Sequence, residues 1–210
     1  PGTTRSATTT PPTTINDMNP TLTRTTLIAA PLAMTAYGTA RIIGRLDGHY
    51  GPGPDWQTAH LLGLAGMLLF IPVTLTLRRH LTTARNPTTA ITLLGLTTTV
   101  IQFTADMLLA LAATDRDDLR RLQHQFSDLP GIQLAIYDIG PLLFFIGIVV
   151  MATLATRTHH LPWWSPTLML IAVLLPTADL NLMPATGLLM LIALLPLHTP
   201  TRTATPGPAH

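Results

Sequence analysis

The tripeptide Thr-Ala-Asp occurs twice in this chain, in "FTADMLLAL" (103–111) and in "LPTADLNLMP" (175–184). Each copy places a carboxylic acid inside, or at the rim of, a long apolar run. Ionisable side chains inside a membrane are costly, face the interior of a helix bundle and mark functional sites. Asp106 and Asp179 are therefore the first candidates for acid chemistry, and Asp138 joins them because it lies near the start of another apolar run.

A neutral carboxylic acid in an apolar pocket can protonate an epoxide or an alkene, and a second carboxylate can stabilise the resulting cation. Desolvation and a neighbouring acid favour the neutral form of such a group, whereas a nearby arginine favours the charged form. We expect Asp106 to be the proton donor and Asp138 or Asp179 to be the partner carboxylate, with Arg41 tuning the site. Structural alternatives stay open: Asp106 paired with Arg41 or Arg45, Asp138 at a helix N-terminus, and Asp179 as a turn residue.

The composition sets the environment in which these acids lie. Of the 210 residues, 47% are hydrophobic and only 10% are charged, against about 25% charged in an average soluble domain. Every acid is Asp, every base is Arg, and cysteine is absent, a usage that suggests an actinobacterial source and excludes disulfides and thiolate metal sites. The net charge of +2 and the lack of a basic cluster argue against a nucleic-acid partner.

The apolar residues form runs that are long enough for membrane helices. A helix needs about 20 residues to cross the hydrocarbon layer, and the runs do not alternate as barrel strands do. We predict an all-α, polytopic bundle of six transmembrane helices over 25–198, with disordered tails at 1–24 and 199–210. The expected helices cover residues 26–46, 58–77, 88–113, 133–156, 163–179 and 183–198.

The arginines predict the orientation. Six crossings place both tails and the loops at 78–87 and 157–162 on one side, which carries seven arginines against five on the other. The opposite side also carries most of the aspartates, which dilute its positive charge. The positive-inside rule then places both termini in the cytoplasm of a bacterial inner (plasma) membrane.

Threading the six helices brings the polar side chains to the outer half of the bundle. Asp106 lies about seven residues from the end of its helix, which is roughly 10 Å deep at 1.5 Å per residue. Aromatic rings near the same end could face a cation. The residues that we expect at this site are Arg41, Arg45, Trp56, His60, Gln102, Phe103, Asp106, Tyr137, Asp138 and Asp179.

Two outer loops accompany this site. The Gly- and Pro-rich segment 46–57 is expected to form an ordered cap or a short re-entrant loop. The segment 114–130 places Leu119, Leu122 and Phe126 at helical spacing among charges, which predicts an amphipathic surface helix. No metal-binding or nucleotide-binding motif occurs, and only His60 could serve a haem from inside the bundle, so we expect no cofactor and no metal.

The stretch "PDWQTAHLLGLAGMLLFIPVTLTLRRHL" (54–81) resembles helix 2 of small six-helix actinobacterial membrane proteins. The plan of residues 26–198, a compact bundle with few acids at one end, is similar to the integral-membrane terpene cyclases of meroterpenoid and indole-terpenoid pathways. That resemblance implies acid-initiated cyclisation of a lipophilic isoprenoid, with membrane lipid and a lipophilic small molecule as partners. The fungal relatives have seven helices and also use Glu, so Asp106 and Asp138 are candidates by position and not by a shared motif.

Two other classes of function remain as alternatives. A proton- or solute-coupled transporter would also bury Asp, Arg and His, but polar groups confined to one half of the bundle leave no continuous path across a bilayer. A non-catalytic membrane partner protein would need no pocket. The shape of the site distinguishes these classes, because a closed pocket open to lipid favours an enzyme and an aqueous vestibule on both sides favours transport.

Overall fold

A computed structural model describes residues 20–46, 48 and 51–198 of the chain, and all regular secondary structure within these residues is helical. The prediction of an all-α protein is therefore confirmed. The helices are α1 (Pro20–Ile43), α2 (Pro54–Arg79), α3 (Arg85–Ala112), α4 (Arg116–Ser127), the π-helix η1 (Gln133–Ile139), α5 (Gly140–Arg157), α6 (Ser165–Ala178), the 3-10 turn η2 (Leu180–Leu182), α7 (Met183–Leu194) and the 3-10 turn η3 (Leu195–His198).

Each of the six apolar runs forms a helix, and five helical stretches are long and apolar enough to cross a membrane. These stretches are Thr23–Ile43, Pro54–Arg79, Arg85–Ala112, Gln133–Arg157 and Leu180–His198. The remaining apolar helix, α6, has 14 residues. Length and composition therefore indicate a multi-pass membrane protein.

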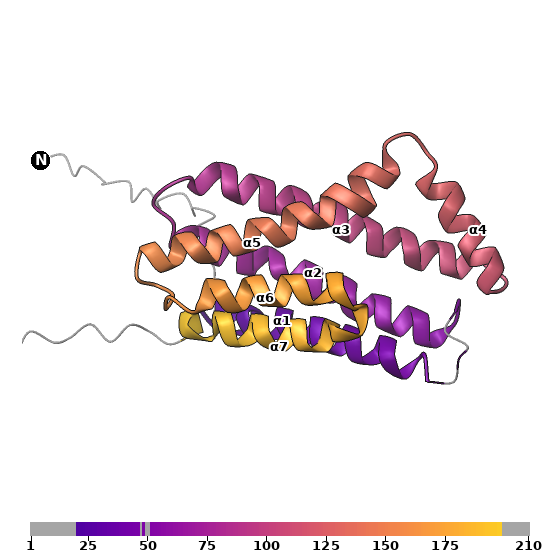
Figure 1. Cartoon of the computed structure of the whole chain (residues 1–210), viewed down its shortest axis with the longest axis horizontal. Helices are drawn as coiled ribbons and strands as arrows, with labels where there is room; N and C mark the ends of the chain where they lie inside the picture. Colours follow the sequence, from indigo (N-terminus) through magenta and orange to yellow (C-terminus); the bar gives the residue numbers. More distant parts are fainter. Residues whose placement is uncertain (1–19, 47, 49–50, 199–210) are drawn as a thin grey trace, which may run out of the picture.

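The long helices pack side by side as an elongated bundle (Figure 1). Neighbour contacts follow a closed ring in the order α1, α2, α3, α5, α6, α7 and back to α1. The ring encloses buried apolar side chains such as Phe70 of α2 and Phe144 of α5, whose ring centroids lie 5.3 Å apart. Helix α4 stands outside the ring and contacts α3 at one end of the bundle.

Glycines allow the closest helix approaches in the ring. A Cβ atom on Gly95 of α3 would lie 2.2 Å from the backbone nitrogen of Phe144 in α5. A Cβ atom on Gly187 of α7 would lie 2.3 Å from the hydroxyl of Thr35 in α1. In membranes, such small residues let two backbones meet, because van der Waals packing replaces the hydrophobic effect between helices.

The two ends of the bundle differ in charge. One end, which we call the Asp-bearing end, is formed by residues 43–46, 51–57 and 112–133; the Asp-free end is formed by residues 20–25, 78–86 and 156–165 (Figure 1). The Asp-free end carries five arginines and no aspartate in these segments: Arg24, Arg78, Arg79, Arg85 and Arg157.

The observed boundaries depart from the expected ones at the first helix. Helix α1 begins at Pro20, within the tail expected at 1–24, because proline is preorganised for a first helical turn and the hydroxyl of Thr25 bonds back to the carbonyl of Thr21 at 2.9 Å. Residues 1–19 of the tail expected at 1–24, the tail expected at 199–210, and residues 47 and 49–50 of the cap expected at 46–57 lie outside the described residues. The helix expected within 114–130 is present as α4.

Candidate functional site

Asp106 is buried in α3, with only 8% of its surface exposed. Its Oδ1 atom accepts a hydrogen bond from the hydroxyl of Tyr137 at 3.0 Å and another from Nε2 of Gln123 at 3.3 Å. Tyr137 belongs to η1 and Gln123 belongs to α4, so side chains from two other elements hold the carboxyl of α3. Both of these bonds end on Oδ1, which leaves Oδ2 to carry the proton when the acid is neutral.

The π-helix η1 presents Tyr137 to Asp106. It leads directly into α5, and the buried side chain of Ile136 anchors it against the bundle. Short π-helical segments are rare and often occur at functional sites. The next residue, Asp138, is exposed and accepts a hydrogen bond of 2.9 Å from Gln133. The neighbouring residues Tyr137 and Asp138 therefore face different parts of the structure, and of the two only Tyr137 contacts Asp106.

Helix α4 is folded onto this site by its apolar face. Asp115 caps its N-terminus by accepting hydrogen bonds from the backbone N–H groups of Asp117 and Asp118. Leu119 is buried, and the ring of Phe126 lies 6.4 Å from that of Tyr137. Gln123 lies one turn after Leu119 and therefore faces α3.

The charges of α4 are paired along its outer surface. Arg120 forms an ion pair of 2.7 Å with Asp117, and Arg121 pairs with Asp118. The Arg121 guanidinium and the backbone N–H of Thr114 hold the pKa of Asp118 below its ordinary value. Because these ion pairs are exposed to solvent, they contribute little to the stability of the fold.

A pocket of about 260 Å³ opens beside Asp106. Its wall combines the buried acid with hydrogen-bonding groups and basic side chains, and it fits a small polar group better than a long apolar chain. The lining residues are Asp106, Arg120, Gln123, His124, Ser127, Gln133 and Tyr137.

Arg41 of α1 is as buried as Asp106, with 8% of its surface exposed, and its Nη1 atom has no hydrogen-bond partner. The charges of Arg41 and Asp106 both act on Tyr37. Two ion pairs are found among the described residues, and both lie in α4. Arg41 and Asp106 therefore form no ion pair with each other. Arg45 is exposed and lies beyond the end of α1. The alternative in which Arg41 pairs directly with Asp106 is therefore not realised.

Three of the expected residues, Trp56, His60 and Phe103, cluster with Tyr37 between α1, α2 and α3, and we call these four residues the aromatic cluster. The ring of His60 stacks on Trp56 at 4.1 Å, and Tyr37 meets Phe103 edge to face at 5.3 Å. Nδ1 of His60 lies 2.9 Å from the carbonyl oxygen of Trp56, which assigns the proton to Nδ1. The rings pack on one another and do not line the pocket beside Asp106.

Two other expected residues lie apart from the pocket. Asp179 is exposed, and its carboxylate accepts a hydrogen bond of 2.8 Å from the backbone N–H of Asn181, so it acts as the capping residue of η2. Gln102 is half-buried one turn before Asp106 and does not line the pocket. The structure thus brings Asp106 and Tyr137 together and leaves Asp138 and Asp179 in exposed turns or helix starts.

Helix α4 and Gln133 contribute residues to the pocket that the sequence did not predict. Gln123 lies four residues after Leu119 and three before Phe126, on the apolar face that the spacing itself predicts. A polar residue on that face is the signal that could have identified Gln123. Arg120, His124 and Ser127 also line the pocket and belong to the same helix, α4. No sequence signal marks Gln133.

In the part of the chain that the structure describes, no group of three or more His or Asp side chains is placed to hold a metal ion. Comparison with protein families, curated proteins and solved structures finds no match for this chain. The site must therefore be interpreted from its own geometry.

Proposed function

We propose that this protein is a membrane enzyme in which Asp106 is the general acid for cyclisation of a lipophilic isoprenoid. The observation that carries the proposal is a buried carboxyl whose Oδ1 is held by Tyr137 and Gln123 beside a small pocket. In this reading six helices cross the bacterial inner membrane, both termini face the cytoplasm, and the pocket lies toward the outer leaflet.

The hydrogen bonds suit proton donation from Oδ2. When the Oδ2 proton passes to an epoxide oxygen or an alkene carbon, the negative charge that remains is stabilised by the donors already aimed at Oδ1. The substrate cation closes a ring and then loses a proton to a base, for which His124 on the pocket wall is the candidate. Return of that proton to Oδ2 of Asp106 restores the acid, so the net reaction is an isomerisation.

The pocket size refines the expected substrate pose. About 260 Å³ accommodates the reacting end of an isoprenoid and not its whole chain, so the apolar tail lies along the bundle in the lipid. The exposed and separately bonded Asp138 and Asp179 have no partner role in this mechanism. Arg120 lies on the pocket wall with its charge paired to Asp117, and Arg41 shares with Asp106 only its effect on Tyr37.

The test is conversion of prenylated epoxides and alkenes by membranes that contain the protein. Asp106→Asn keeps the acceptor at Oδ1 but carries no proton to donate, so we expect product formation to fall by at least 100-fold, the usual contribution of a general acid. Asp179→Asn is the matched control, because it makes the same change at an exposed turn and should retain the wild-type rate.

Product formation by Asp106→Asn at the wild-type rate would overturn the role of Asp106. If no isoprenoid is converted and proteoliposomes instead take up a solute in a proton-dependent way, the function is transport. The helix core argues against that result: among the buried polar residues, Arg41, His60 and Asp106 are the ionisable ones, and all come from the half of the bundle nearer the Asp-bearing end.

A further inference from the structure

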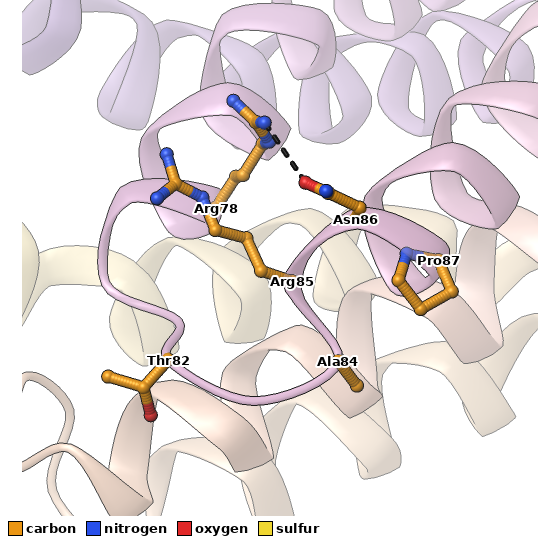
Figure 2. A pocket seen from close by; sticks show the side chains of 6 residues that line it. All are labelled: Arg78, Thr82, Ala84, Arg85, Asn86 and Pro87. Carbon is orange, nitrogen blue, oxygen red and sulfur yellow. Dashed lines mark hydrogen bonds between the residues drawn. The ribbon is translucent and has the colours of Figure 1, made fainter.

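A charged pocket lies at the opposite end of the bundle from Asp106. It has a volume of about 620 Å³ and sits where the chain passes from α2 to α3 (Figure 2). We call it the arginine pocket; its lining residues are Arg78, Thr82, Ala84, Arg85, Asn86 and Pro87. The wall therefore carries two guanidinium groups, a hydroxyl and an amide, and no acid.

Among the residues that the structure describes, no acid forms an ion pair with either arginine. Nη2 of Arg78 donates a hydrogen bond of 3.1 Å to the side-chain oxygen of Asn86, which fixes Arg78 across the loop (Figure 2). Nε of Arg85 is buried and has no hydrogen-bond partner. The ion pairs among the described residues lie in α4, at the other end of the molecule. A buried guanidinium N–H without an acceptor costs free energy, and an anion in the pocket would remove that cost.

The backbone adds positive potential to the same place. Ala84 adopts a left-handed conformation with φ of 51°, and α3 begins immediately after it with no side-chain cap and no acid in its first turn. The start of this 28-residue helix carries the partial positive charge of its dipole. The helix dipole and the two guanidinium groups both favour a negatively charged ligand, so the start of α3 adds to the site that the arginines form.

The surroundings indicate where such an anion would come from. The arginine pocket follows Leu77, a fully buried residue at the end of the apolar α2. Trp163, at the same end of the bundle, is 80% exposed, as aromatic residues are at the boundary between lipid and water. The pocket is therefore at the level of lipid headgroups.

We propose that the arginine pocket binds a phosphate group, whose oxygens match the planar fork of a guanidinium. The group can belong to an anionic phospholipid headgroup or to a soluble phosphate. This proposal is independent of the reaction at Asp106, because the two sites lie at opposite ends of the bundle and share no residue.

The experiment measures thermal stabilisation of the purified full-length protein. One arm adds short-chain phosphatidylglycerol to detergent micelles, a second adds inorganic phosphate, and a third adds an anionic detergent without phosphate. A ligand that binds only the folded state raises Tm in proportion to its affinity. Stabilisation by phosphatidylglycerol alone assigns the site to lipid, and stabilisation by inorganic phosphate assigns it to a soluble ligand.

Variants link the effect to the arginine pocket. We expect Arg85→Gln to weaken phosphate or lipid binding by at least tenfold, and Arg78→Gln supplies a second test should the first variant fold poorly. Arg157→Gln is the matched control, because it removes one exposed arginine from the same end without altering the pocket wall. Equal weakening by Arg157→Gln, equal stabilisation by the phosphate-free anionic detergent, or no stabilisation in any arm would each overturn the proposal.

Discussion

Asp106 depends on two donors that approach from different elements, and they differ in how firmly they are held. Tyr137 is fixed by the π-helix and by the ring of Phe126, and its bond to Oδ1 measures 3.0 Å. Gln123 reaches the same oxygen at 3.3 Å from a surface helix. We infer that Tyr137 contributes more to the stabilisation of the carboxylate that forms when the proton leaves.

Replacing Tyr137 with Phe should therefore slow the proposed reaction without unfolding the protein. A hydrogen bond to a charged group contributes about 1.5–3 kcal/mol, which corresponds to roughly 10- to 100-fold in the rate of the chemical step. The rate is measured in membranes under single-turnover conditions. Tyr37→Phe is the control, since it removes a hydroxyl from the aromatic cluster outside the pocket, and a similar loss in both variants would argue against the assigned role.

At the scale of elements, the contact between α3 and α5 positions the site. Gly95 and Phe144 bring the two backbones together, and this contact sets the distance between Asp106 on α3 and Tyr137 just before α5. A methyl group at Gly95 would require the helices to separate. The geometry of the acid is thus a consequence of close packing deeper in the bundle.

Gly95→Ala should destabilise the protein by about 1–3 kcal/mol, the usual cost of overpacking a core. The change would appear as a lower Tm in detergent, followed by tryptophan fluorescence. Gly53→Ala is the matched control, because no atom lies within 4 Å of the position of its new Cβ atom. An unchanged Tm for Gly95→Ala would show that α3 and α5 are not held at the observed distance.

The elements also show how far the sequence predicts this protein. Hydropathy identified all six apolar helices, and helical spacing identified α4, because both signals are local. The neighbours of Asp106 could not be predicted in the same way. Asp138 and Tyr137 are adjacent in the chain, and the way η1 packs against the bundle makes Tyr137 half-buried and leaves Asp138 exposed. The interaction of Gln123 with Asp106 depends on the angle at which α4 returns to α3, which no periodicity encodes.

On the scale of the whole molecule, the charge difference between the ends predicts which way the protein faces. The Asp-free end carries arginines without acids, and the positive-inside rule places such an end in the cytoplasm. Because the chain has no cysteine, a single introduced thiol reports its own location without background labelling.

In intact cells, a membrane-impermeant maleimide should label Gln125→Cys on α4 and leave Thr82→Cys unlabelled. Both positions are exposed in the structure, so accessibility to the reagent depends on the side of the membrane. Labelling of Thr82→Cys in cell lysates serves as the control for thiol reactivity. The reverse pattern in intact cells would invert the orientation, and labelling of both positions would contradict an odd number of crossings between them.

The hairpin of α6 and α7 has a consequence for the lipid around it. With 14 residues, α6 is about 21 Å long, whereas the hydrocarbon layer is about 30 Å thick. The turn at Asp179 and Asn181 is exposed, and in Figure 1 it ends short of the tip formed by α3 and α4. In the six-crossing arrangement that we propose, a bilayer that solvates this turn becomes thinner along one side of the protein, and we expect that depression to give the polar end of a membrane-borne molecule a shallower route into the bundle.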